Sequence, residues 1–183
     1  MEHTFAGIRS PSDPCIANAV RRTVLADVRT LAPCAVTFRL NDSVMSDKQL
    51  AHRISLVVLA REAAGSEEPD LQLRCAAADK QTVVSASALR APEGVRVATP
   101  NVPLVILGPG QSIDATVHTR VAGGGEHARF CPAEIVGYRP SAAGVTLTVE
   151  PTGAMPAREV LEAALDALCA RVERCVEHLR AAS

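Results

Sequence analysis

The strongest constraint on the fold is an apolar stripe near the end of the chain. After Pro156, apolar residues recur every three or four positions: Leu161, Leu165, Leu168, Val172, Val176 and Leu179. This period predicts one long helix that begins at Pro156 and carries a continuous apolar seam. Such a seam can be ordinary core along its whole length. Because it exceeds what a small domain needs to cover itself, we expect its later residues to meet a partner helix.

A shorter stripe lies near the start of the chain. Its apolar residues are four positions apart: Ile16, Val20, Val24 and Val28. Asp13 and Pro14 supply an N-cap carboxylate and a proline at the first helical position, so we expect a helix from there to about Arg29. Arg21 and Arg22 lie in the middle of this helix. From composition alone, the simplest interpretation is a solvated pair beside the stripe.

Turn and strand patterns divide the middle of the chain. Residues 34–41 alternate between apolar and polar side chains and predict a half-buried strand. Ser46 and Gln49 have the spacing of a capping box that opens a second helix. The small, polar and turn-rich residues 60–70 mark a boundary, and short strand patterns fill residues 71–121.

The order of these elements predicts an α+β fold. Residues 3–9 resemble a short strand, and residues 135–149 resemble a hairpin that precedes the long helix. We expect a discontinuous outer domain, residues 1–59 and 134–183, with helices packed on an antiparallel sheet. An inserted β-rich domain, residues 60–133, would interrupt it.

Composition excludes several classes of function. Hydrophobic residues make up 48% of the 183 residues, which is enough for a packed core. The net charge of −1 and the lack of a basic block argue against direct nucleic-acid binding. No apolar run approaches the length of a membrane span, and residues 1–13 show no signal-peptide pattern, so we expect a reducing compartment without membrane contact. The six cysteines include no C-x-x-C pair, so we expect free thiols.

No residue pattern indicates an active site, a cofactor or a metal. The glycines at residues 123–125 lack the G-x-G-x-x-G and G-K-[ST] contexts of phosphate-binding loops. His127 and Cys131 are too few for a structural zinc site. His52 has no nucleophile motif beside it. We therefore expect no catalytic residue, no bound metal and no cofactor.

Three separated segments resemble one known family. The first contains N-A-V-R-R at residues 18–22 and D-K-Q-L-A-H-R-I-S-L at residues 47–56. The second contains L-G-P-G-Q-S-I at residues 107–113 and E-H-A-R-F-C-P at residues 126–132. The third is V-E-P-T-G-A-M-P-A-R-E at residues 149–159. In this order they resemble the large α-like assembly subunit of DNA-dependent RNA polymerase: the bacterial α N-terminal domain, its archaeal counterpart and the third-largest subunit of eukaryotic polymerase II.

This sequence also departs from the family pattern. The E-H-A-R run favours the archaeal and eukaryotic branch, but Phe130 stands where that branch usually has tryptophan. Arg29 and Val58 stand where the family usually has proline. The cysteine-rich metal module that many relatives carry in the insert is absent. The compact insert suggests a divergent lineage, such as a large DNA virus.

The resemblance implies two partner surfaces. The dimer interface with a smaller α-like subunit would use these side chains: Val20, Val24, Val28, Leu168, Val172, Val176 and Leu179. The contact with the second-largest, β-like subunit would use another set: Asn18, Arg21, Arg22, Glu126, His127 and Arg129. Guanidinium groups suit such a contact because they pair with carboxylates through two parallel hydrogen bonds. For Glu126, His127 and Arg129, the ordinary alternative is a plain hairpin loop.

These implications amount to a non-catalytic assembly subunit of a multisubunit DNA-directed RNA polymerase. The inserted domain would dock on the β-like subunit, and small accessory polymerase subunits are further candidate partners. Such a subunit would serve transcription in the nucleus or cytoplasm, or in a virion if the chain is viral. The main alternative is a homodimeric regulatory or interaction module that kept the dimer fold without a polymerase. An enzyme with its own site is disfavoured, because no nucleophile, metal or phosphate motif is present.

Overall fold

The chain folds into two compact units. The structure is a computed structural model, and it describes these parts of the chain: residues 8–10, 14–61, 68–141 and 144–182. Met1–Thr30 and Gly123–Ser183 form one unit, which we call the outer unit, and Leu31–Ala122 form the other, the inserted unit. The α+β class and the β-rich insertion expected from the sequence are confirmed. The sequence places the boundaries after residues 59 and 133, whereas the two units divide after residues 30 and 122.

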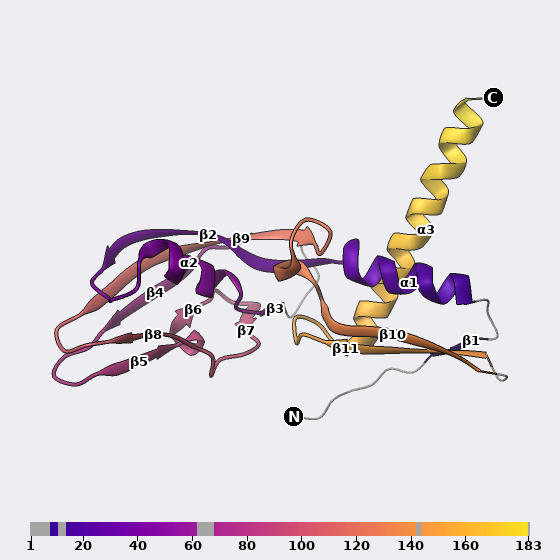
Figure 1. Ribbon diagram of the computed structural model, residues 1–183. Helices are drawn as coiled ribbons and strands as arrows, with labels where there is room; N and C mark the ends of the chain where they lie inside the picture. Colours follow the sequence, from indigo (N-terminus) through magenta and orange to yellow (C-terminus); the bar gives the residue numbers. More distant parts are fainter. Residues whose placement is uncertain (1–7, 11–13, 62–67, 142–143, 183) are drawn as a thin grey trace. The chain divides into compact units, whose positions relative to one another are not determined.

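The outer unit combines a three-stranded sheet with two α-helices (Figure 1). Its elements in chain order are β1 (Ile8–Ser10), α1 (Pro14–Ala26), the 3-10 turn η2 (Ala128–Phe130), β10 (Ala133–Ser141), β11 (Gly144–Pro151) and α3 (Ala157–Ala181). The strand order is β1-β11-β10, and both pairs are antiparallel. The β10–β11 hairpin is the one expected from the sequence. Of the expected strand over residues 3–9, residues 3–7 lie outside the described residues.

The apolar stripe that begins on α1 is buried within the outer unit; Val20 and Val24 lie on the helix, and Val28 lies two residues beyond its end. Val20, Val24 and Val28 are only 6, 0 and 2% exposed. They share a core with residues from the hairpin and the start of α3: Ala133, Leu147, Val149, Val160, Leu161 and Ala164. Side chains that the chain's own core covers are not available to a second chain. The sequence-based expectation placed these three valines at a dimer interface, whereas in the structure they lie in the core of their own unit.

The end of α1 is fixed by backbone hydrogen bonds around Thr23. The carbonyl of Thr23 accepts from the amide of Asp27 at 2.9 Å and from the amide of Val28 at 3.3 Å. The helix ends at Ala26, earlier than expected, and the chain enters β2 (Arg29–Asn41). The expected N-cap, Asp13, lies outside the described residues.

Helix α3 begins where the sequence predicts and changes character along its length. Pro156 is the N-cap, and its carbonyl accepts from the amide of Val160 at 3.0 Å. The buried residues are confined to the first two turns: Ala157, Val160, Leu161 and Ala164. From Arg171 to Ala182 every residue is exposed. The end of the helix extends past both α1 and the sheet of the outer unit (Figure 1).

The inserted unit is built mainly of strands. Besides most of β2, its elements are α2 (Asp47–Ser55), β3 (Leu59–Arg61), β4 (Leu71–Ala76), β5 (Thr82–Ser85), the 3-10 turn η1 (Ala86–Ala88), β6 (Leu89–Arg90), β7 (Val95–Val97), β8 (Pro103–Leu107) and β9 (Ser112–Gly123). The strand orders are β2-β9-β4-β6, β3-β7 and β5-β8. The register of β4 against β9 is antiparallel, with Leu73 opposite Ala115.

Helix α2 explains why the boundaries differ from those expected. Its Leu50 and Ile54 are 0% exposed and pack in the same core as Leu73 of β4. The helix therefore covers strands of the inserted unit and belongs to that unit. Its N-terminus has the expected capping box: Ser46 Oγ accepts from the amide of Gln49 at 3.4 Å, and Gln49 Oε1 accepts from the amide of Ser46 at 3.3 Å.

Candidate functional site

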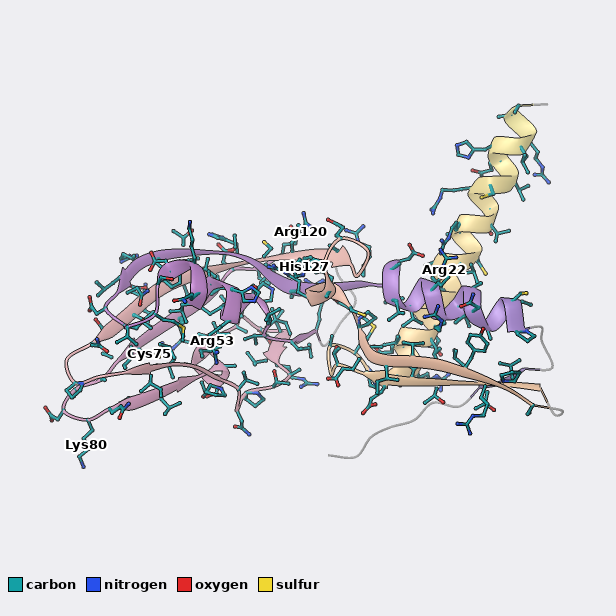
Figure 2. All side chains as sticks on the ribbon, viewed as in Figure 1. Arg22, Arg53, Cys75, Lys80, Arg120 and His127 are labelled. Atoms are coloured by element: carbon teal, nitrogen blue, oxygen red, sulfur yellow. The ribbon has the colours of Figure 1, made fainter. Side chains whose placement is uncertain are left out.

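The expected arginine pair divides into one ordered and one exposed side chain. Arg21 is partly buried on α1, and Asn18 lies one turn before it. Asn18 Oδ1 accepts from Arg21 Nε at 3.2 Å and from Arg21 Nη2 at 3.1 Å. Arg22 is exposed on α1 (Figure 2). The helix thus presents two guanidinium groups, of which one is held by a neighbouring amide.

The three glycines at the end of β9, residues 123–125, lie against the C-terminal end of α1. The amide of Gly125 donates to the carbonyl of Ala26 at 3.0 Å. A Cβ atom on Gly124 would lie 2.2 Å from the carbonyl oxygen of Leu25, and one on Gly123 would lie 2.5 Å from that of Ala26. Only glycine allows the loop to approach the helix so closely. The close packing of the loop on the helix explains why glycine occupies these positions, without a role in phosphate binding.

Glu126, His127 and Arg129 follow the glycines. The amide of Glu126 donates to the carbonyl of Gly123 at 3.0 Å, which closes a turn beside the end of α1. His127 is exposed, and its Nδ1 accepts from the amide of Arg129 at 3.1 Å and from Arg129 Nε at 3.2 Å (Figure 2). All six residues expected to contact the β-like subunit therefore belong to the outer unit, whereas the last three were expected in the insert.

The end of α3 carries an apolar surface that the described parts of the chain leave exposed. Its members, which we call the exposed stripe, are Leu165, Val172, Val176 and Leu179, at 41, 56, 38 and 69% exposure. Positions separated by seven, eleven and fourteen residues lie on one side of an α-helix. Leu168, also expected in the dimer interface, is partly buried and packs against the core of the outer unit. The seam thus changes from core to surface near Leu168.

Arg171 links α3 to α1 close to the point where the seam changes from core to surface. Its Nη2 donates to Thr23 Oγ1 at 2.9 Å and forms an ion pair with Asp27 Oδ2. Thr23 is fully buried, and its hydroxyl donates to the carbonyl of Ala19 at 3.0 Å. Sequence reasoning missed Arg171, because no local pattern links it to residues near the other end of the chain.

Comparison with known proteins identifies the fold. The model of the RNA polymerase Rpb3/Rpb11 dimerisation domain matches residues 11–172. The chain belongs to this family. The resemblance inferred from the sequence motifs is therefore confirmed.

Named relatives of this dimerisation-domain protein come from archaea and a eukaryote. DNA-directed RNA polymerase subunit Rpo3 of Thermococcus kodakarensis is 32% identical over 132 residues, which cover 68% of this chain and 51% of the relative. Rpo3 of Methanocaldococcus jannaschii is 31% identical over 165 residues, or 89% and 84% of the two chains. DNA-directed RNA polymerase II subunit rpb3 of Dictyostelium discoideum is 28% identical over 158 residues, or 72% and 52%. The chain spans about half the length of the Thermococcus and Dictyostelium relatives.

In this member of the Rpb3/Rpb11 family, one histidine lies between a carboxylate and a hydroxyl group, as the histidine of a catalytic triad does. His118 Nδ1 lies 2.9 Å from Asp70 Oδ1, and His118 Nε2 lies 3.0 Å from Thr37 Oγ1. The imidazole and carboxylate side chains are 40 and 49% exposed. Such an open arrangement on a sheet fits a link between neighbouring segments better than a water-excluding active site.

The described residues supply no group of three or more His, Cys, Asp or Glu side chains arranged to hold a metal ion. Among the titratable groups, burial raises the pKa of the Cys75 thiol, and the nearby Arg90 opposes part of that rise. No helix within the described ranges is both long and apolar enough to cross a membrane.

Proposed function

We propose that the chain is a non-catalytic assembly subunit of a multisubunit DNA-directed RNA polymerase. The observation that carries the proposal is the exposed stripe on α3, in a chain whose family is defined by a dimerisation domain. Relatives named as polymerase subunits support the same role. The subunit would act within the polymerase complex, wherever that complex transcribes, and would hold the larger subunits together without contacting nucleic acid itself.

The exposed stripe would bind a smaller α-like polymerase subunit. Leu165, Val172 and Val176 form a continuous apolar side of a helix, and burying them would remove apolar surface from water. A helix with a matching apolar side would cover such a stripe, as in a coiled coil. Ile16 is also 54% exposed, at the start of α1. It is a further candidate for this interface.

The β-like, second-largest subunit would bind the surface around α1. Arg22 lies one turn before Ala26, whose carbonyl accepts from Gly125, so the arginines and the loop that carries Glu126 belong to neighbouring parts of the outer unit. Guanidinium groups on one side and Glu126 on the other could meet complementary charges. Small accessory polymerase subunits would bind the inserted unit.

Co-expression with the smaller α-like subunit of the same organism tests the proposed dimer. Alone, the chain should self-associate or aggregate, because the exposed stripe lacks a cover. Together, the two chains should elute as a 1:1 complex in size-exclusion chromatography with light scattering. Val176→Asp should abolish that complex, because an unpaired charge in an apolar interface costs several kcal/mol. A well-behaved monomer that ignores the second chain would contradict the proposal.

The matched control is His178→Asp. His178 is exposed and lies about 160° around α3 from Val176, so the same charge there should leave the complex intact. Far-UV circular dichroism of both variants should match that of the unmodified chain. Affinity purification then separates polymerase assembly from the homodimeric alternative: large polymerase subunits co-purify in the first case and are absent in the second.

A further inference from the structure

Asn18 and Arg21 form the most specific polar contact on the proposed β-like surface. They lie three residues apart on α1, so their side chains are on the same side of the helix. A single oxygen, Asn18 Oδ1, accepts from both Nε and Nη2 of Arg21. Two donors that converge on one acceptor fix the plane of the guanidinium group as well as its position.

This contact determines which edge of the Arg21 guanidinium group already has a partner. The guanidinium group has a side edge, formed by Nε and Nη2, and an end edge, formed by Nη1 and the second hydrogen of Nη2. Asn18 occupies the side edge. Among the residues that the structure describes, no carboxylate forms an ion pair with Arg21. Its end edge therefore offers two parallel N–H groups, which match the two oxygens of a carboxylate.

We propose that Asn18 is a positioning residue, which holds Arg21 so that its end edge binds a carboxylate of the β-like subunit. The inference rests on the proposed contact with that subunit and replaces a direct contact by Asn18 itself. Without Asn18, the long arginine side chain would have to be ordered when the partner binds. Removing the contact should weaken binding about two- to tenfold, which corresponds to the usual cost of ordering one such side chain.

The test is a double-mutant cycle on the purified heterodimer, with its affinity for the β-like subunit measured by titration calorimetry. The variants are Asn18→Ala, Arg21→Ala and the two combined. We expect Asn18→Ala to weaken binding when Arg21 is present and to have no further effect when Arg21 is absent. Arg22→Ala is the control for simple loss of positive charge, because Asn18→Ala should add its full effect in that background.

Asn18→Asp distinguishes positioning from direct contact. Aspartate keeps an oxygen acceptor in the same place but removes the amide N–H donors. If Asn18 acts by holding Arg21, this variant should bind within about twofold of the unmodified protein in a buffer whose salt screens the added charge. If Asn18 donates to the partner directly, it should bind as weakly as Asn18→Ala. Thermal unfolding of each heterodimer checks that the variants remain folded.

Each outcome separates this inference from the function on which it rests. If Arg21→Ala weakens binding and Asn18→Ala does not, the positioning role is overturned and the proposed surface stands. If Asn18→Ala costs the same with and without Arg21, the two residues act independently and the positioning role is again overturned. If Arg21→Ala has no effect, Arg21 is not part of the contact and the inference fails; if the unmodified heterodimer does not bind the β-like subunit at all, the proposed surface itself fails.

Discussion

The apolar stripes of α1 and of the end of α3 have nearly the same repeat but opposite surroundings. Val20, Val24 and Val28 are four positions apart and almost completely buried in the outer unit. Val172 and Val176 are also four apart, yet they are 56 and 38% exposed. Both segments have the period that predicts an amphipathic helix. The repeat therefore predicts the helix and its apolar side, but it does not predict which surface covers that side.

Length accounts for much of the difference. Helix α1 has 13 residues and α3 has 25, so α3 is about 18 Å longer at 1.5 Å per residue. The hairpin and the first turns of α3 together form the core that covers α1. The later turns of α3 do not reach that core. They extend beyond the elements of the outer unit (Figure 1). A short helix can be covered by its own domain, while a long one can need a second chain.

The largest expected effect is from Val24→Asp, which attacks the covered stripe. Val24 is 0% exposed, so the new carboxylate would be buried without a partner. We expect the free energy of unfolding to fall by about 3–5 kcal/mol, measured by chemical denaturation and followed by circular dichroism. Val172→Asp is the matched control: in the chain kept dilute enough to prevent self-association, it should change stability by less than about 0.5 kcal/mol. Equal losses in both variants would break the distinction between the two stripes.

Much of the fold follows from the sequence because local rules agree with the packing. The capping box at Ser46, the proline at the start of α3 and the alternation in the β10–β11 hairpin all depend on residues close together in the chain. The unit boundaries differ from those expected because they depend on where α2 packs. The local sequence does not say which sheet its apolar face covers, and only the tertiary structure places Leu50 in the core of the inserted unit.

The candidate site was predictable only in part. Family motifs identified Arg21 and Arg22, and the structure adds the hydrogen bonds from Arg21 to Asn18. Val20, Val24 and Val28 were expected at an interface but lie in the core of the outer unit, because periodicity does not separate a core from an interface. The ion pair of Arg171 with Asp27 had no signal in the sequence, since long-range contacts between charged residues leave no local pattern.

An intermediate effect is expected from Gly124→Ala, which tests the packing of the glycine loop on the end of α1. Within the described residues, the exposed end of α3 has no such loop against it. The added Cβ would lie 2.2 Å from the carbonyl oxygen of Leu25, so the loop or the helix end must move. We expect a loss of about 1–3 kcal/mol in the free energy of unfolding. Gly137→Ala is the control, because a Cβ there meets nothing within 4 Å. An equally small effect at both positions would mean that the loop does not support α1.

The smallest expected effect is a difference in thiol reactivity between a cysteine beside the exposed stripe and a partly buried cysteine. Cys175 is exposed on α3 next to Val176, and Cys75 is partly buried in the inserted unit. Burial raises the pKa of the Cys75 thiol, so less of it is the reactive thiolate at pH 8. In the chain kept dilute enough to prevent self-association, we expect iodoacetamide to modify Cys175 faster than Cys75, as measured by mass spectrometry of timed samples, and the difference should narrow as the pH rises. Adding the smaller α-like subunit should slow Cys175 and leave Cys75 unchanged, because only the exposed stripe would be covered. If Cys175 keeps its rate in a complex shown to be 1:1, the partner binds elsewhere and the exposed stripe is not the interface.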